Sequence, residues 1–319
     1  MRETKKIFVV LFLVLWVGTA SAFAGLEVSG FVDFLYQNQQ GKNVTFGMGT
    51  YEIDFVSEFS AKVSFQGAVD VEGEEVGLGQ TLVDFNLIDE KLGLQAGLID
   101  MPFGLDYKVF ATPDRKLVTV PLITDLMMDG GWDDIGVNFH GALPLLNYNL
   151  YIVNGMGQDG SGAPVNQLED NNSAKTVGGR IGILPIKDLE LGFSYLRGPY
   201  LDGSAKQDLC RTGGDIQFTY EPVHIKGEFV RGKEEILGGG ENEHEGFYLQ
   251  VLGDATQNVY GVARYGYWKP KGGDRVTKIT IGLGYDLAEN ISLRSEYQIN
   301  NETPSVNDNL FSMQVVMSF

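Results

Sequence analysis

The chain has 319 residues, a formal net charge of −18, 42 glycines, ten prolines and one cysteine. Such an acidic chain repels nucleic acid, and a single cysteine cannot form an intrachain disulfide. Many glycines with few prolines suit a protein of many strands and tight turns, although an acidic soluble secreted protein stays open on composition alone.

Residues 1–24 have the composition of an export signal. Arg2, Lys5 and Lys6 precede an apolar run over 7–17, and small residues follow it. This order predicts a secretory signal peptide that is cleaved after Ala22 or Ala24. The apolar run is shorter than the roughly 20 residues that a membrane-spanning helix needs. Loss of residues 1–24, whose net charge is +2, would change the charge of the chain from −18 to −20 and leave a mature domain over 25–319.

Sixteen segments of the mature chain alternate between apolar and polar residues. They cover 26–36, 50–57, 61–71, 79–88, 91–99, 132–140, 146–154, 175–184, 189–198, 212–221, 223–232, 245–252, 257–268, 275–286, 290–299 and 308–319. A period of two predicts β-strands with one apolar and one polar face. A length of about ten residues is typical of tilted strands that cross a membrane.

The connections between these segments are alternately short and long. The short ones are 57–60, 89–90, 141–145, 185–188, the turn at Pro222, 253–256 and 288–289, and the long ones include 37–49, 100–131, 155–174, 199–211 and 232–244. Outer-membrane barrels have short periplasmic turns and long outer loops, and closure removes the sheet edges that lipid cannot satisfy. We therefore predict an all-β fold, a transmembrane antiparallel β-barrel of about 16 strands.

The predicted inward face carries charges of opposite sign on opposite walls. The acidic wall contains Asp33, Glu52, Asp54, Asp70 and Asp84, and the basic wall contains Arg180, Lys226, Arg264, Lys278 and Arg294. A barrel of this size is too wide for side chains to fill, so we expect both walls to line water. The two walls would then impose a transverse electric field, unless these charges are ordinary solvated residues with no collective role.

The third long connection, 100–131, is unusually apolar for an exposed loop. Structureless connections of this length are usually functional, and apolar side chains need a surface to bury them. We expect the loop to fold inward and narrow the pore. Its candidate constriction residues are Asp106, Lys108, Asp114, Arg115, Lys116 and Asp125. A loop that caps the rim or contacts a neighbouring subunit is the alternative.

Three basic residues occur where upward strands leave the apolar band. Arg197, Arg231 and Lys269 each follow aromatic or aliphatic residues in the same lipid-facing register. Cations at this height can form charge-assisted bonds to the phosphates of lipopolysaccharide. They could equally mark the place where each strand meets water.

The last segment ends on Phe319, which resembles the assembly signal of outer-membrane barrels. Signal peptide, sixteen strands, long third loop and terminal Phe together resemble the Gram-negative trimeric porins. The stretch 97–104, GLIDMPFG, also resembles a segment of the phosphate-selective porin family. The resemblance implies a homotrimer in the bacterial outer membrane. Phosphate-selective members use lysine and arginine at the constriction, whereas this loop has at least as many acids as bases.

The sequence contains no recognisable catalytic motif. His140 and His224 fall on inward faces and His244 in an acidic loop, and none lies in a motif with a serine or aspartate. No phosphate-binding glycine loop or cysteine–histidine cluster is present, so we expect no enzyme, no cofactor and no metal site. The predicted function is a passive diffusion channel for small hydrophilic solutes or ions. The alternatives are a non-channel structural or adhesive barrel and a phosphate- or anion-selective porin.

Overall fold

The computed structural model describes residues 25–319 except 74, 110, 129–130, 159–163, 166, 171, 202–206, 237–238, 303–305 and 307. The predicted signal peptide lies outside this part of the chain. No helix among the described residues is long and apolar enough to cross a membrane.

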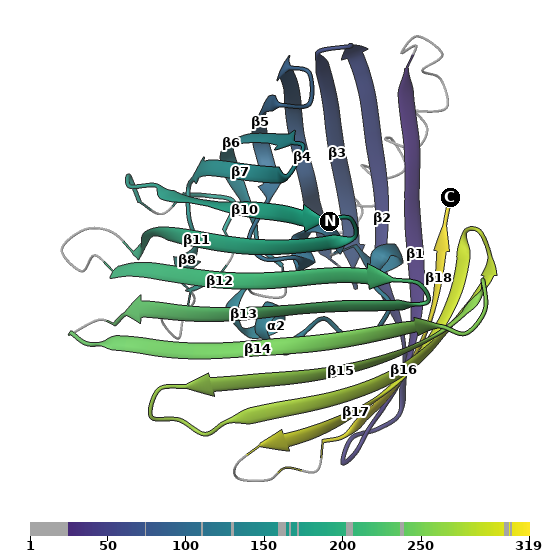
Figure 1. Cartoon of the computed structure of the whole chain (residues 1–319). Coiled ribbons are helices and arrows are strands. Elements are labelled where there is room, and N and C mark those ends of the chain that lie inside the picture. The colour runs from purple at the N-terminus through teal and green to yellow at the C-terminus, as the bar shows by residue number, and fades with distance from the viewer. Residues whose placement is uncertain are drawn as a thin grey trace, which may run out of the picture.

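Sixteen antiparallel strands in the described part of the chain form one closed barrel, arranged in chain order around it (Figure 1). They are β1 (Leu26–Gln39), β2 (Thr45–Ser60), β3 (Val63–Glu72), β4 (Glu75–Ile88), β5 (Leu92–Asp100), β6 (Asp133–Leu143), β7 (Leu146–Val153), β10 (Thr176–Ile186), β11 (Leu189–Leu201), β12 (Gln207–Tyr220), β13 (Val223–Glu235), β14 (Glu241–Asp254), β15 (Val259–Pro270), β16 (Val276–Ala288), β17 (Ile291–Glu302) and β18 (Leu310–Ser318). The predicted transmembrane barrel of 16 strands is confirmed.

The first and last strands close the barrel. β1 pairs with β18 from Phe31 opposite Ser318 to Gln39 opposite Leu310. The backbone of Phe319 continues the ladder, because its N–H donates to Gly30 O at 2.9 Å and its carbonyl accepts from Gly30 N–H at 3.1 Å. The terminal residue therefore contributes two of the hydrogen bonds that remove the sheet edge.

Burial along each strand is inverted relative to a soluble protein. On β16, the outward-facing Ile281 and Leu283 are 58% and 63% exposed, whereas the inward-facing Thr280 is 1% exposed. The same alternation recurs on β10, β11 and β14. An apolar outer face and a polar inner face are what a barrel surrounded by lipid requires.

The two ends of the barrel differ in their connections. At one end, here called the turn end, seven connections of two to four residues join consecutive strands, at 61–62, 89–91, 144–145, 187–188, 221–222, 255–258 and 289–290. The opposite end, here called the loop end, carries the longer connections 101–132 and 154–175. The second of these contains the separate two-stranded sheet of β8 (Gly157–Gln158) and β9 (Pro164–Val165).

Several predicted loops at the loop end are shorter than expected. The connections 37–49, 199–211 and 232–244 shrink to 40–44, 202–206 and 236–240, because the flanking strands continue beyond the apolar band. Backbone pairing needs no apolar alternation, and ion pairs support it there. Arg231 lies 3.1 Å from Glu243, and Lys233 lies 3.2 Å from Glu241 across β13 and β14.

Candidate channel and its lining

The long connection 101–132, here called the third loop, contains short helices and packs against inward-facing side chains. Its elements are η1 (Asp106–Val109), η2 (Thr112–Asp114) and α2 (Leu122–Met127). Phe103, Ile123 and Met127 of the loop share one buried apolar cluster with Tyr248 of β14 and Leu196 of β11. The first and last residues of the third loop are joined to each other, since Met101 N–H donates to Trp132 O at 2.8 Å.

Asp106 forms the first polar attachment of this loop. The residue is 7% exposed, and its carboxylate accepts hydrogen bonds from Thr124 Oγ1 at 2.6 Å, Lys226 Nζ at 2.9 Å and Tyr248 Oη at 3.0 Å. Burial by itself raises the pKa of Asp106, but the Lys226 charge and these hydrogen bonds outweigh it and hold the pKa below its ordinary value. The carboxylate therefore stays ionised, and it holds the loop to β13 and β14.

Glu228 and Glu296 bind the loop through its backbone. Glu228 Oε2 accepts from Leu105 N–H at 3.1 Å. Glu296 Oε2 accepts from Val118 N–H at 2.8 Å and from Thr119 N–H at 3.2 Å. Both acids lie in the inward register of their strands, β13 and β17.

Two arginines of the predicted basic wall bind the same loop. Arg294 donates to the carbonyls of Thr112 at 2.6 Å and Pro113 at 2.9 Å. Arg264 donates to Thr119 Oγ1 at 2.8 Å and to the Val120 carbonyl at 3.0 Å. These guanidinium groups satisfy backbone carbonyls that the irregular loop would otherwise bury without partners.

The prediction that the basic wall lines water is wrong for three of its members. Arg180, Arg264 and Arg294 are 0%, 6% and 3% exposed. The loop covers the last two, and Arg180 donates to Asp215 on β12 at 2.6 Å and 3.0 Å and to Glu190 on β11 at 2.7 Å. A buried guanidinium needs such partners, because an unpaired buried charge is costly. Lys226 and Lys278 are partly exposed in the same inward register.

The acidic wall behaves differently. Asp33 is 1% exposed and accepts from Gln314 Nε2 and Thr50 N–H, each at 2.7 Å, so the expectation that it lines water is wrong. Asp84 lies 3.2 Å from Gln95 Nε2 and 3.0 Å from His140 Nε2. The remaining predicted members, Glu52, Asp54 and Asp70, line a cavity.

That cavity has a volume of 750 Å³ and is here called the acidic cavity. It extends from Ser318 and Phe319, at the carboxyl end of β18, to Asp100 and Asp133, where β5 and β6 reach the loop end. Its lining among the described residues contains seven acids and no lysine or arginine: Glu52, Asp54, Asp70, Glu72, Asp100, Asp114 and Asp133. Asp100 and Asp133 are paired in register across β5 and β6. Both flank the third loop in the sequence, but nothing in the sequence indicated that they would meet.

A second cavity of 420 Å³ lies between the third loop and β12–β15. Its lining includes Arg115, Lys116, Lys226 and Arg264, and it continues to His224 and Asp254 at the turn end. Asp114 at the tip of η2 borders both cavities. The third loop therefore separates an acidic space from a space of mixed charge.

The predicted constriction residues divide into buried and exposed groups. Asp106 is buried, whereas Asp114, Lys116 and Asp125 are exposed. Lys108 forms an ion pair with Glu190 at 3.2 Å, and Lys116 Nζ lies 4.9 Å from the centre of the Tyr260 ring. Burial first, and then the nearby charge of Arg294, lower the pKa of Arg115.

The three predicted rim cations lie on the outward face, near the loop end. Arg197 lies 3.4 Å from Asp208, and Arg231 lies 3.1 Å from Glu243. Lys269 is exposed and pairs in register with Glu245. These positions form a belt of alternating charge on adjacent strands.

Comparison with known proteins supports the architecture. No family model matches the chain. An uncharacterized protein of Aquifex aeolicus is 22% identical over 334 aligned residues, which cover 86% of this chain and 75% of that protein.

Several solved structures share the fold of this chain at low sequence identity. The loop L8 deletion mutant of OmpT, an outer membrane protein of Vibrio cholerae, has a TM-score of 0.69 at 12% identity, covering 92% of this chain and 99% of its own. The outer membrane channel DcaP of Acinetobacter baumannii has a TM-score of 0.69 at 13% identity, covering 94% and 99%. The anion-selective porin of Comamonas acidovorans has a TM-score of 0.65 at 11% identity, covering 92% and 99%. The chain thus has the fold of the outer-membrane porins and channels of Gram-negative bacteria.

Proposed function

We propose that this protein is a porin, a passive diffusion channel for small hydrophilic solutes and ions across the outer membrane, and that it prefers cations. The observation that carries this proposal is the acidic cavity, whose lining includes residues near both ends of the barrel and, among the described residues, no basic one. A water-filled passage lined by carboxylates concentrates cations and repels anions.

The third loop acts as the constriction in this proposal. It occupies the basic side of the barrel interior, where Arg264, Arg294 and Lys226 hold it, and the acidic side stays open. The loop is attached at both η1 and η2, so it narrows the passage at a fixed position. Asp114 at its tip adds one more carboxylate to the open side.

The same geometry argues against phosphate or anion selectivity. A phosphate site needs accessible lysine or arginine, and the acidic cavity has neither in its described lining. Arg180, Arg264 and Arg294 are bonded to carboxylates or to loop carbonyls. The resemblance of 97–104 to a segment of the phosphate-selective porin family stays a prediction from the sequence.

Ion conduction in planar bilayers tests the proposal. Purified mature protein should form ohmic pores, and a salt gradient should give a reversal potential of the sign expected for cation preference. A reversal potential of the opposite sign would support the anion-selective alternative. A folded, heat-modifiable barrel with no conductance would instead support a structural or adhesive role.

We propose further that residues 1–24 are the cleaved signal peptide and that the mature barrel is a homotrimer. OmpT of Vibrio cholerae, whose TM-score in its trimer form is 0.66, supports the second point by analogy of fold. Amino-terminal sequencing of the membrane-extracted protein tests the first. The mass of the detergent complex tests the second.

Lipopolysaccharide is the proposed membrane partner of the rim. Arg197, Arg231 and Lys269 project from the outward face, and phosphates could replace their present carboxylate neighbours. Substitution of all three by glutamine should reduce the lipopolysaccharide that co-purifies while conductance is unchanged. Unchanged lipopolysaccharide content would make them ordinary rim residues.

A further inference from the structure

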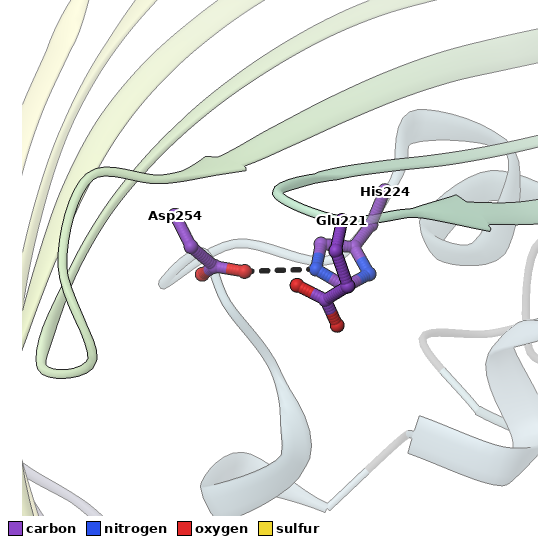
Figure 2. A group of neighbouring side chains, drawn as sticks. All are labelled: Glu221, His224 and Asp254. Atoms are coloured by element: carbon purple, nitrogen blue, oxygen red, sulfur yellow. Dashed lines mark hydrogen bonds and ion pairs between the residues drawn. The ribbon is translucent and has the colours of Figure 1, made fainter.

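The hairpin turn between β12 and β13 lies beside the end of β14 at the turn end of the barrel. Asp254 N–H donates to Pro222 O at 2.9 Å, which fixes the two backbones together. Three side chains with metal-binding chemistry converge there, namely Glu221, His224 and Asp254 (Figure 2). Their potential ligand atoms all lie within 4.8 Å of one another, and they are the one such group of three among the described residues.

We propose that Glu221, His224 and Asp254 form a binding site for a divalent transition-metal ion, of which Zn²⁺ is the best fit. One imidazole and two carboxylates match the preferences of Zn²⁺, whereas Ca²⁺ and Mg²⁺ favour oxygen ligands only. Two carboxylates beside a neutral imidazole also balance the charge of the ion. This assignment replaces the expectation, from the sequence, of no metal site.

The geometry needs only small adjustments to accept the ion. His224 Nε2 lies 2.8 Å from Asp254 Oδ2. Bond lengths of about 2.0–2.1 Å place neighbouring ligand atoms of a tetrahedral zinc site about 3.3 Å apart. His224 Nε2 and Asp254 Oδ2 must therefore move slightly apart, while the Glu221 carboxylate must move closer to both. Glu221 is exposed in a two-residue turn, so its side chain has room to move.

The second nitrogen of the ring also has a suitable partner. His224 Nδ1 lies 3.4 Å from Thr219 Oγ1 on the paired strand. A ligating histidine commonly donates its other N–H to an oxygen, which fixes the tautomer and the ring orientation. If Nδ1–H donates to Thr219, the Nε2 lone pair points toward the two carboxylates.

The site is accessible to an ion and to water. The side chains of His224 and Asp254 are 33% and 38% exposed, and both line the 420 Å³ cavity beneath the third loop. Water can complete the coordination from this space, as in zinc sites that have three protein ligands. Binding does not depend on conduction, so a barrel that failed the conductance test could still hold the ion.

His140 provides a matched control. Its ring also lies on the inward face near the turn end, and Nε2 is 3.0 Å from Asp84 Oδ1. This pair is a histidine with one carboxylate, and among the described residues it belongs to no group of three. It therefore reports how much binding an isolated histidine–aspartate pair provides.

Calorimetric titration of untagged, chelator-treated, detergent-folded protein with ZnCl₂ in excess Mg²⁺ tests the proposal. We expect one Zn²⁺ per chain, an affinity reduced at least about tenfold by Glu221→Gln and by His224→Ala, and no change with His140→Ala. Heat-modifiable mobility on gels would verify that each variant is folded. The visible absorption of Co²⁺ bound in place of Zn²⁺ should show the same dependence on His224. Absence of saturable binding, or equal effects of His140→Ala and His224→Ala, would overturn the site.

Discussion

Attachment of the third loop at Asp106 should determine how often the loop leaves the barrel wall. The change Asp106→Asn keeps the shape of the side chain but removes its charge from Lys226, which is 24% exposed. Loss of a hydrogen bond to a charged group costs about 1.5–3 kcal/mol. Because 1.4 kcal/mol corresponds to a factor of ten, the opening equilibrium of the loop should increase roughly 10- to 100-fold.

Amide hydrogen exchange, followed by mass spectrometry on the protein in detergent, measures that equilibrium directly. The N–H groups of Gly104 and Leu105 donate to Ser194 and Glu228 on the barrel wall, so their exchange reports loop opening. Lys108→Met is the control in the same segment, since its ion pair with Glu190 is partly exposed and worth at most about 1 kcal/mol. It should accelerate exchange less than roughly fivefold. Equal exchange in Asp106→Asn and the parent protein would refute the role of Asp106 as an anchor.

Four further outcomes test the loop, the acidic cavity and the lipid-facing surface. Arg294→Ala removes the two bonds to the tip of the loop and should increase single-channel conductance and its noise; an unchanged current would place the tip outside the passage. The double change Glu52→Gln and Asp54→Asn should reduce cation preference, measured as reversal potential, without changing the melting temperature. Leu283→Lys, at a side chain 63% exposed on the lipid face, should impair folding into bilayers by about 2–4 kcal/mol if it lies near the midplane, measured by denaturant titration. Acid should also release the loop. Because the pKa of Asp106 is lowered, this attachment is complete above the ordinary aspartate pKa of about 3.9 and is lost as the pH falls through the lower pKa of the folded state. Protection of the Leu105 N–H from hydrogen exchange should therefore disappear only below about pH 4.

The strands could be predicted from sequence because each carries its own environmental signal. Ile279, Ile281 and Leu283 alternate with residues that face the interior, and a lipid-facing strand must show this period whatever its neighbours are. The ends of the strands carry no such signal. Beyond the apolar band, backbone pairing continues through residues such as Lys233 and Glu241, so the predicted loops were too long.

The site was harder to predict because its contacts join distant parts of the chain. Glu296 accepts from Val118 N–H across 178 residues of sequence, and Arg294 donates to a loop carbonyl across 182. A side chain can bond to the backbone of any residue type, so the sequence does not reveal which residue provides the backbone group. Hence the position of Arg294 on an inward face could be predicted, and its partner could not.

The distribution of charge in the interior has one physical cause. An irregular loop carries backbone carbonyls and N–H groups that need partners wherever the loop is buried. Arg264 and Arg294 serve the carbonyls, and Glu228 and Glu296 serve the N–H groups. The two positive and two negative charges of these four residues balance, so that side contributes little net field to the open passage. On the opposite wall, Glu52, Asp54 and Asp70 line the acidic cavity, whose described lining contains no lysine or arginine to balance them. Their negative charge therefore determines the expected preference for cations.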